Sequence, residues 1–125
     1  DYVGIQAYFP LCKNPSCSKE EIISKWKTIN ADLQNFYQQQ NKPILFTEIG
    51  YRSAKDAAVK PWEWPERNQD DNFSEEAQAQ AYEAFFKSTW NEKWLSGVYF
   101  WKWYPRLSER IPQTDFTPQQ KQAST

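Results

Sequence analysis

Apolar and polar positions divide the chain into three short apolar runs separated by two amphipathic segments. The clearest run is 44–49 (Ile-Leu-Phe-Thr-Glu-Ile), which follows a proline and precedes a glycine. Short, nearly continuous apolar runs of this kind are typical of strands buried on both faces in parallel sheets. Runs near 2–8 and 97–103 combine β-branched and aromatic residues and predict two further strands.

Two segments with helical periodicity lie between these strands. The first opens with a capping box formed by Ser18 and Glu21 and continues with apolar residues at three- and four-residue spacing, up to a polar run at 38–41. The second opens at Ser74, with acidic residues in its first turn. The order β-α-β-α-β with long helical crossovers predicts parallel strands and right-handed connections.

This α/β pattern predicts a partial (β/α)₈ TIM barrel. Three parallel strands leave two sheet edges unprotected. A complete barrel takes about 250 residues, whereas this chain has 125. Because the chain lacks methionine and its first strand begins at once, we expect it to be a fragment. An unrelated doubly wound domain is disfavoured, since no glycine-rich phosphate loop follows a strand. From residue 106 onwards the polar sequence predicts a surface excursion with a frayed end.

Glu48 is the one ionisable residue of the central strand and lies at its carboxyl end. Ligands and catalytic groups gather at that end of parallel strands, in open sheets and in barrels alike. A carboxylate there is costly to bury unless it is paired, hydrogen-bonded or used in chemistry. Glu48 is therefore either the partner of a nearby Arg or Lys or a functional carboxylate. Tyr8 lies at the matching end of the first strand.

The charge balance and the residue types of the chain argue against several classes of function. The net charge is −1, with 15 Lys and Arg against 16 Asp and Glu, so we expect no nucleic-acid partner and no anionic membrane surface. No apolar run approaches the roughly 20 residues that a membrane span needs. The chain has no histidine, which excludes His-dependent triads and His-based zinc sites within it. We expect neither a metal nor a cofactor.

Aromatic residues are frequent: seven Trp, seven Tyr and eight Phe. Many cluster at 61–65 and 99–104, beside predicted strand ends. Such rings can pack a core or form platforms for the apolar faces of sugar rings, and their position favours a binding cleft. The long segment 51–73 adds charged residues, which suits polar recognition, although a solvated surface loop is the alternative.

Cys12 and Cys17 are the only cysteines. A zinc site would need four ligands, and the chain offers no further Cys or His. A local disulfide is one interpretation and would indicate an oxidising compartment; two free thiols are the other. A disulfide would thus predict an extracellular or periplasmic protein.

Several segments together resemble the carboxyl-terminal part of retaining (β/α)₈ glycoside hydrolases, most closely the β-mannanases of glycoside hydrolase family 113. The segments that carry this resemblance are 44–51, 61–62, 80–86, 97–103 and 115–119. The resemblance implies that the predicted strands correspond to strands six to eight. Residues 1–125 would then be the carboxyl-terminal portion of a TIM-barrel catalytic domain, with strands one to five absent.

The resemblance also implies roles for individual residues in cleaving a β-1,4-linked polysaccharide, with β-mannan expected. Glu48 would be the catalytic nucleophile, and Tyr8 would hydrogen-bond that carboxylate and keep it ionised. Trp101 would form the floor under the sugar at the cleavage point. Further substrate-binding residues in the wall of the cleft would be Arg52, Trp62, Trp64 and Trp103.

A retaining glycosidase needs a second carboxylic acid about 5–5.5 Å from the nucleophile. In the families that this chain resembles, that acid/base lies at the end of strand four, which these residues do not include. We therefore expect the chain alone to be inactive on natural polysaccharide, and to self-associate or to pair with the missing half. The alternative is a non-catalytic carbohydrate-binding or scaffold module that uses the aromatic platforms.

Overall fold

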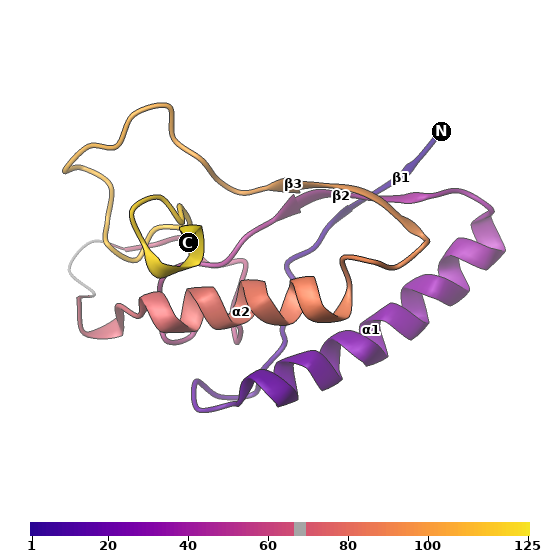
Figure 1. The fold of residues 1–125 in the computed structure, drawn as a ribbon, viewed down its shortest axis with the longest axis horizontal. Helices are drawn as coiled ribbons and strands as arrows, with labels where there is room; N and C mark the ends of the chain where they lie inside the picture. Colours follow the sequence, from indigo (N-terminus) through magenta and orange to yellow (C-terminus); the bar gives the residue numbers. More distant parts are fainter. Residues whose placement is uncertain (67–69) are drawn as a thin grey trace.

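Three parallel strands and two α-helices make up most of the regular structure in the part of the chain that is described. The computed structural model describes residues 1–66 and 70–125. The elements are β1 (Val3–Gln6), α1 (Lys19–Gln40), β2 (Ile44–Ile49), a 3-10 turn η1 (Asp70–Asn72), α2 (Glu75–Ser88), β3 (Leu95–Phe100) and a 3-10 turn η2 (Gln122–Ser124). The strand order is β1-β2-β3, both pairings are parallel, and both helices lie on the same side of the strands (Figure 1). The predicted order of elements and the parallel sheet are confirmed.

β1 is shorter than the predicted strand. It ends at Gln6, so Tyr8 lies two residues beyond it. The Ala7 N–H nevertheless donates a hydrogen bond of 2.7 Å to the Glu48 carbonyl, which extends the pairing with β2 past the end of the strand. Tyr8 is thereby held beside the carboxyl end of β2.

β3 begins and ends earlier than predicted. Leu95 belongs to the strand because it pairs with Ile44, and the strand ends at Phe100. The Trp101 N–H makes one more bond to β2, of 2.7 Å to the Ile49 carbonyl. The aromatic run after Phe100 has high strand propensity, but it lies beyond the ladder and leaves the sheet.

Both helices are capped as their sequences predict. The Ser18 hydroxyl accepts a hydrogen bond of 3.2 Å from the Glu21 N–H, and the Ser74 hydroxyl accepts one of 3.1 Å from the Ala77 N–H. α1 is closed by Asn41 in the left-handed conformation, with φ of 51°. Asparagine is one of the few residues that adopt this conformation at low cost.

Among the described residues the core lies on one face of the sheet, which corrects the expectation that β2 is buried on both faces. Ile44, Phe46 and Ile49 are fully buried under the helices. Leu45 on the opposite face is half-buried and Thr47 is exposed. The Phe46 ring lies 6.0–6.4 Å from the rings of Phe9, Trp26, Phe85 and Trp94. This aromatic cluster joins the sheet to both helices.

The carboxyl-terminal segment is not a frayed surface excursion, contrary to the sequence-based expectation. Residues 114–117 are buried, with Phe116 only 3% exposed. The Gln78 side chain of α2 donates hydrogen bonds of 2.9 Å to the carbonyls of Tyr51 and Phe116. Because buried carbonyls need donors, this one amide fastens the tail to the segment that follows β2.

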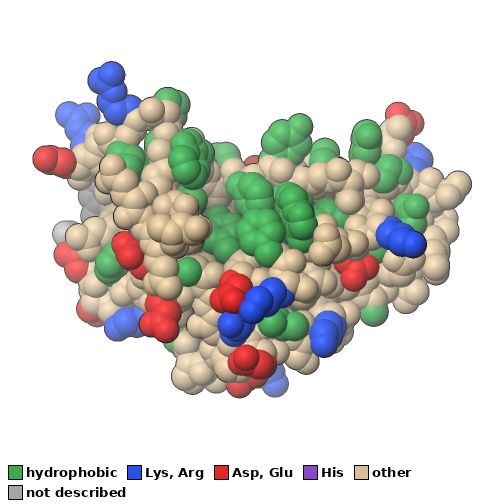
Figure 2. Space-filling model, in the orientation of Figure 1, with side chains coloured by type: hydrophobic (Ala, Val, Ile, Leu, Met, Phe, Trp, Pro, Cys, Tyr) green, Lys and Arg blue, Asp and Glu red, His purple; other side chains and the backbone are tan. Residues whose placement is uncertain are grey.

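The outer side of β3 presents an apolar surface. Phe86 and Trp90 pack against Phe100, and the three side chains are 42–47% exposed. Figure 2 shows apolar side chains gathered in the middle of this face, between α2 and β3. In the described part of the chain, neither helix has the length and apolarity to cross a bilayer.

Two buried tyrosines predict a loss of stability at alkaline pH. Burial raises the pKa of Tyr82 to about 12, and burial raises that of Tyr51 further. Both phenols are less acidic in the folded chain than in the unfolded chain, where the pKa is about 10. Their contribution to stability is therefore complete below pH 10. It is lost as the pH rises towards and through the pKa values that the two phenols have in the folded chain. We expect about 1 kcal/mol of lost unfolding free energy per tyrosine at pH 11.

Urea unfolding at pH 8 and pH 11, with tyrosinate absorbance recorded in parallel, measures this effect. Tyr51→Phe should remove the part of the loss that comes from Tyr51, about 1 kcal/mol. That variant should fold normally at pH 8, because the Tyr51 hydroxyl is buried without a hydrogen-bond partner among the described residues. Equal stability at the two pH values would contradict the expectation.

Candidate active site

The ends of the three strands bring one carboxylate and several aromatic rings together. Glu48 is the penultimate residue of β2 and is half-buried. The Tyr8 hydroxyl donates a hydrogen bond of 2.8 Å to Glu48 Oε2. Tyr8 and Glu48 are 40 positions apart in the sequence. The structure therefore brings together the two residues that the sequence analysis assigned to the reaction centre.

The environment of the Tyr8 hydroxyl keeps it a hydrogen-bond donor. Burial is the first cause that raises the pKa of its phenol, followed by the hydrogen bond to Glu48 and the charge of that carboxylate. The hydroxyl, which an ordinary tyrosine also keeps protonated at neutral pH, therefore stays a donor further into the alkaline range. A hydrogen bond donated to a carboxylate favours its charged form, which is the form that can act as a nucleophile or pair with a cation.

Trp101 follows β3 directly and passes close to the end of β2. Its N–H is bonded to the Ile49 carbonyl, and its own carbonyl lies against Gly50. A Cβ atom added at Gly50 would lie 1.8 Å from the Trp101 carbonyl oxygen. Only glycine leaves room for this approach, which holds the Trp101 backbone against the residue that follows β2.

Gly50→Ala should consequently disturb both the fold and the site. We expect a loss of about 3 kcal/mol in unfolding free energy, because the added methyl group meets backbone that cannot rotate away. Gly97→Ala is the matched control: its Cβ would meet Leu45 Cδ1 at 3.0 Å, the end of a side chain that can shift. Urea unfolding should show a clearly smaller loss for the control, and equal losses would contradict the close-contact explanation.

A row of aromatic rings runs beside the Tyr8–Glu48 pair. The Phe116 ring lies 6.3 Å from that of Tyr8 and 6.5 Å from that of Trp64. The Trp64 ring in turn lies 6.4 Å from Trp101, and each contact is edge-on. The rings come from the end of β1, the loop after β2, the end of β3 and the carboxyl-terminal tail. Trp64 is 66% exposed, so this row combines buried anchors with an accessible face.

The remaining predicted binding residues lie elsewhere. Trp62 and Trp103 are 54% and 65% exposed, outside the ring contacts that join Trp64 to Trp101. Arg52 is only 2% exposed, so the structure does not place it on a cleft wall. Its guanidinium pairs with Asp56 at 3.1 Å and donates to the Lys60 carbonyl at 3.3 Å. Arg52 thus organises the loop that carries Trp62 and Trp64.

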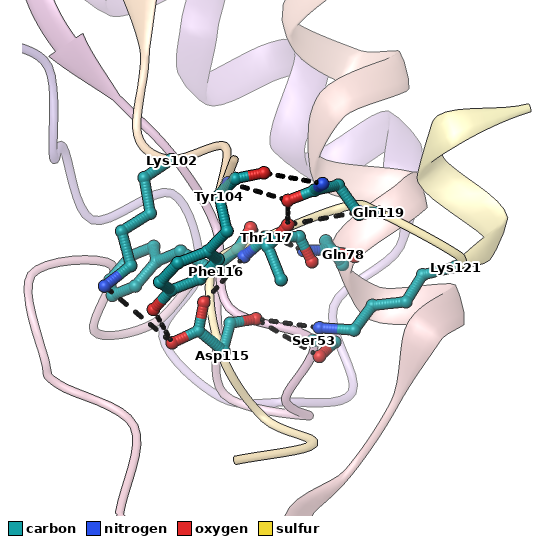
Figure 3. A network of polar contacts seen from close by, with 9 residues as sticks. All are labelled: Ser53, Gln78, Lys102, Tyr104, Asp115, Phe116, Thr117, Gln119 and Lys121. Carbon is teal, nitrogen blue, oxygen red and sulfur yellow. Dashed lines mark hydrogen bonds and ion pairs between the residues drawn. The ribbon is translucent and has the colours of Figure 1, made fainter. Parts of the chain in front are cut away.

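Two charged residues beside the aromatic row were not predicted from the sequence. Lys102 Nζ lies 4.0 Å from Asp115 Oδ2, and Asp115 is 2% exposed (Figure 3). The same carboxylate oxygen accepts a hydrogen bond of 3.0 Å from the Tyr104 hydroxyl. The 115–119 segment contributed to the family resemblance, but only the folded tail reveals that Asp115 is buried next to Lys102.

The two cysteines are joined by a disulfide, Cys12–Cys17, in the loop between β1 and α1. Leu11, just before it, is buried and hydrogen-bonds through its N–H to the Ala58 carbonyl at 2.8 Å. The disulfide loop therefore lies near the loop after β2. A cavity of about 550 Å³ between α2 and residues 107–121 is also lined by none of the predicted site residues.

A parallel sheet with helices on its outer face and a carboxylate at a strand end is the arrangement of a (β/α)₈-barrel enzyme, here in part. The family model for Glycoside Hydrolase Family 113 matches residues 1–120. The chain belongs to glycoside hydrolase family 113, as the sequence resemblance indicated. None of the curated proteins matches it.

Solved structures agree with the fold. The GH113 β-mannanase AaManA from Alicyclobacillus acidocaldarius, in complex with ManMIm, is 25% identical with a TM-score of 0.73. A GH113 β-1,4-mannanase structure is 22% identical with a TM-score of 0.74 and supports the fold alone. Each comparison covers 98% of this chain and 36% of the solved chain. The predicted partial TIM barrel is confirmed.

Proposed function

We propose that this chain provides the nucleophile and part of the sugar-binding surface of a retaining β-mannanase. The observation that carries the proposal is the hydrogen bond from Tyr8 to Glu48 at the carboxyl ends of β1 and β2. Family membership over residues 1–120 supports a glycoside hydrolase, and the similarity to the β-mannanase AaManA favours β-mannan as the substrate.

In the proposed reaction, a Glu48 carboxylate oxygen attacks the anomeric carbon of the sugar. The bond from that carbon to the leaving oxygen breaks, and the pair of electrons leaves with the departing group. Tyr8 holds the second oxygen of the carboxylate, which leaves one oxygen aimed at the sugar. Water then releases the sugar from Glu48 with retained configuration. Trp101 and Trp64 would support the apolar face of the sugar.

The acid/base carboxylic acid of this reaction would come from outside these 125 residues. The chain spans 36% of the length of the solved mannanases that it matches, and we propose that a further part of a barrel covers its open face. That part could belong to the same catalytic domain or to a second copy. We also propose a location outside the cytoplasm, supported by the Cys12–Cys17 disulfide.

An activated substrate tests the nucleophile without requiring the acid. A 2,4-dinitrophenyl β-mannoside releases an anion that is stable without a proton, so the first step needs only Glu48 and a bound sugar. We expect release of about one dinitrophenolate per chain, followed by a slow phase, because the second step lacks its base. Dinitrophenyl β-glucoside is the specificity control.

Two outcomes would decide against the proposal. If the chain binds mannotetraose but releases no dinitrophenolate, a non-catalytic carbohydrate-binding module is the better description. If it neither binds the sugar nor releases the phenolate, the site does not serve mannosides. Equal release from the glucoside would reject the mannose preference alone.

A further inference from the structure

The ammonium group of Lys102 lies among three aromatic rings and a buried carboxylate. Lys102 Nζ is 4.6 Å from the centroid of the Tyr104 ring, 5.5 Å from that of Trp101 and 5.6 Å from that of Trp64. All three distances are within the range of about 6 Å in which a cation is attracted to a ring. We propose that Lys102 is a positioning residue that holds Trp64 in place for sugar binding. This inference rests on the proposed function.

Asp115 fixes the ammonium group in that position. Its carboxylate is anchored at both oxygens, by the Tyr104 hydroxyl at 3.0 Å and by the Thr117 N–H at 3.0 Å (Figure 3). An anion that is 2% exposed needs a cation nearby, and Lys102 supplies it at 4.0 Å. The Lys102 side chain is 24% exposed and reaches from the buried pair towards the surface.

The three rings near Lys102 differ in what else holds them: the nearest, that of Tyr104, is also fixed by its hydroxyl bond to Asp115. Trp101 is fixed through its backbone, which is hydrogen-bonded to Ile49 at 2.7 Å and packed on Gly50. Trp64 lies in the long loop after β2 and is 66% exposed. Its ring is held by edge contacts with Trp101 and Phe116 and by the cation. Removing the charge should therefore move Trp64 and leave Trp101 largely unchanged.

The first measurement needs no sugar. The chain is labelled with 5-fluorotryptophan, and the ¹⁹F resonance of Trp64 is identified by its loss in Trp64→Phe. We expect Lys102→Met to shift this resonance, and Lys102→Arg to restore it close to the wild-type position because the charge is kept. Lys93→Met, at an exposed lysine before β3, is the matched control and should leave it unchanged.

The second measurement is mannotetraose affinity by calorimetry. Lys102→Met should weaken binding about three- to thirty-fold, the range expected for a cation held against rings. Lys102→Arg should recover most of this loss. In a Trp64→Ala background, Lys102→Met should cause no further loss, because a residue that acts through Trp64 has nothing left to position.

Each outcome decides a separate point. An unshifted Trp64 resonance in Lys102→Met overturns the positioning role, whatever the sugar does. An equal loss of affinity with and without Trp64 also overturns it, since Lys102 would then act independently. The wild-type chain could instead bind no mannotetraose while Lys102→Met still shifts the Trp64 resonance. The proposed function then fails, and so does the role of Lys102 in sugar binding. The contact between Lys102 and Trp64 would stand.

Discussion

Glu48→Gln should reduce dinitrophenolate release from the activated β-mannoside by roughly 10³-fold or more, because loss of a covalent nucleophile removes the reaction path itself. The amide has nearly the same shape as the carboxylate but cannot attack the anomeric carbon. The Tyr8 hydroxyl can still donate to the amide oxygen that replaces Glu48 Oε2, so the fold should be preserved. Single-turnover absorbance measurements give the rate, and circular dichroism reports the fold.

Glu63→Gln is the matched control for this result. Glu63 lies in the loop after β2, is 45% exposed and pairs with Lys60 at 3.6 Å. Exposed pairs of this kind contribute little to stability. Release by the control should stay within about two-fold of the wild type, in line with the small effect of most surface changes. Comparable losses in Glu48→Gln and Glu63→Gln would contradict the assignment of Glu48.

Phe46→Ala should lower the unfolding free energy by about 3–5 kcal/mol, the usual cost of emptying a buried aromatic site. Phe46 is fully buried, and its ring contacts four other aromatic rings. Two of these rings belong to the helices α1 and α2, and two belong to the segments that flank the strands. A domain is typically stable by only about 5–15 kcal/mol, so this variant should be unfolded or nearly so at 37 °C.

Phe36→Ala is the control for Phe46→Ala, since Phe36 in α1 is 36% exposed. We expect it to lose less than about 1 kcal/mol. Urea unfolding followed by circular dichroism measures both variants without depending on tryptophan fluorescence. A loss for Phe46→Ala as small as that for Phe36→Ala would show that the cluster does not hold the sheet to the helices.

Local patterns in the sequence were sufficient to predict the order of elements and to place Glu48 and Tyr8 at neighbouring strand ends. Periodicity, capping residues and crossover length determine the order of elements and the parallel strands, because each depends on neighbours within a few positions. Glu48 and Tyr8 could be matched because the carboxyl ends of parallel strands meet at one edge. Their hydrogen bond, of 2.8 Å in the structure, was implied by the family resemblance and not by that rule.

Other features depend on how the chain folds back on itself. The tail looks polar in sequence, yet Phe116 is buried and joins the aromatic row. Lys102 and Asp115 are 13 positions apart in a segment with no regular structure, so no periodicity connects them. Arg52 is drawn inward by Asp56, four residues later, and a charge in a loop gives no sign of such burial.

The ends of the strands were hard to predict for a related reason. Aromatic residues favour strands, and this preference extended the predicted third strand through Trp103. The structure ends it at Phe100, where the Trp101 carbonyl lies against Gly50 and the chain departs from the sheet. Likewise, the apolar sequence of β2 suggested burial on two faces, while helices cover only one in the described residues.

The most direct test of the central claim is the intact mass of the chain before and after incubation with a 2-deoxy-2-fluoro β-mannoside that carries a dinitrophenyl leaving group. The fluorine slows both the formation and the hydrolysis of the glycosyl-enzyme, and the dinitrophenyl leaving group speeds up its formation only. The covalent intermediate should therefore accumulate. The account predicts a gain of one fluoromannosyl group, mapped by peptide sequencing to Glu48 and absent from Glu48→Gln. Attachment at another residue, or no attachment, would contradict the claim that Glu48 is the nucleophile.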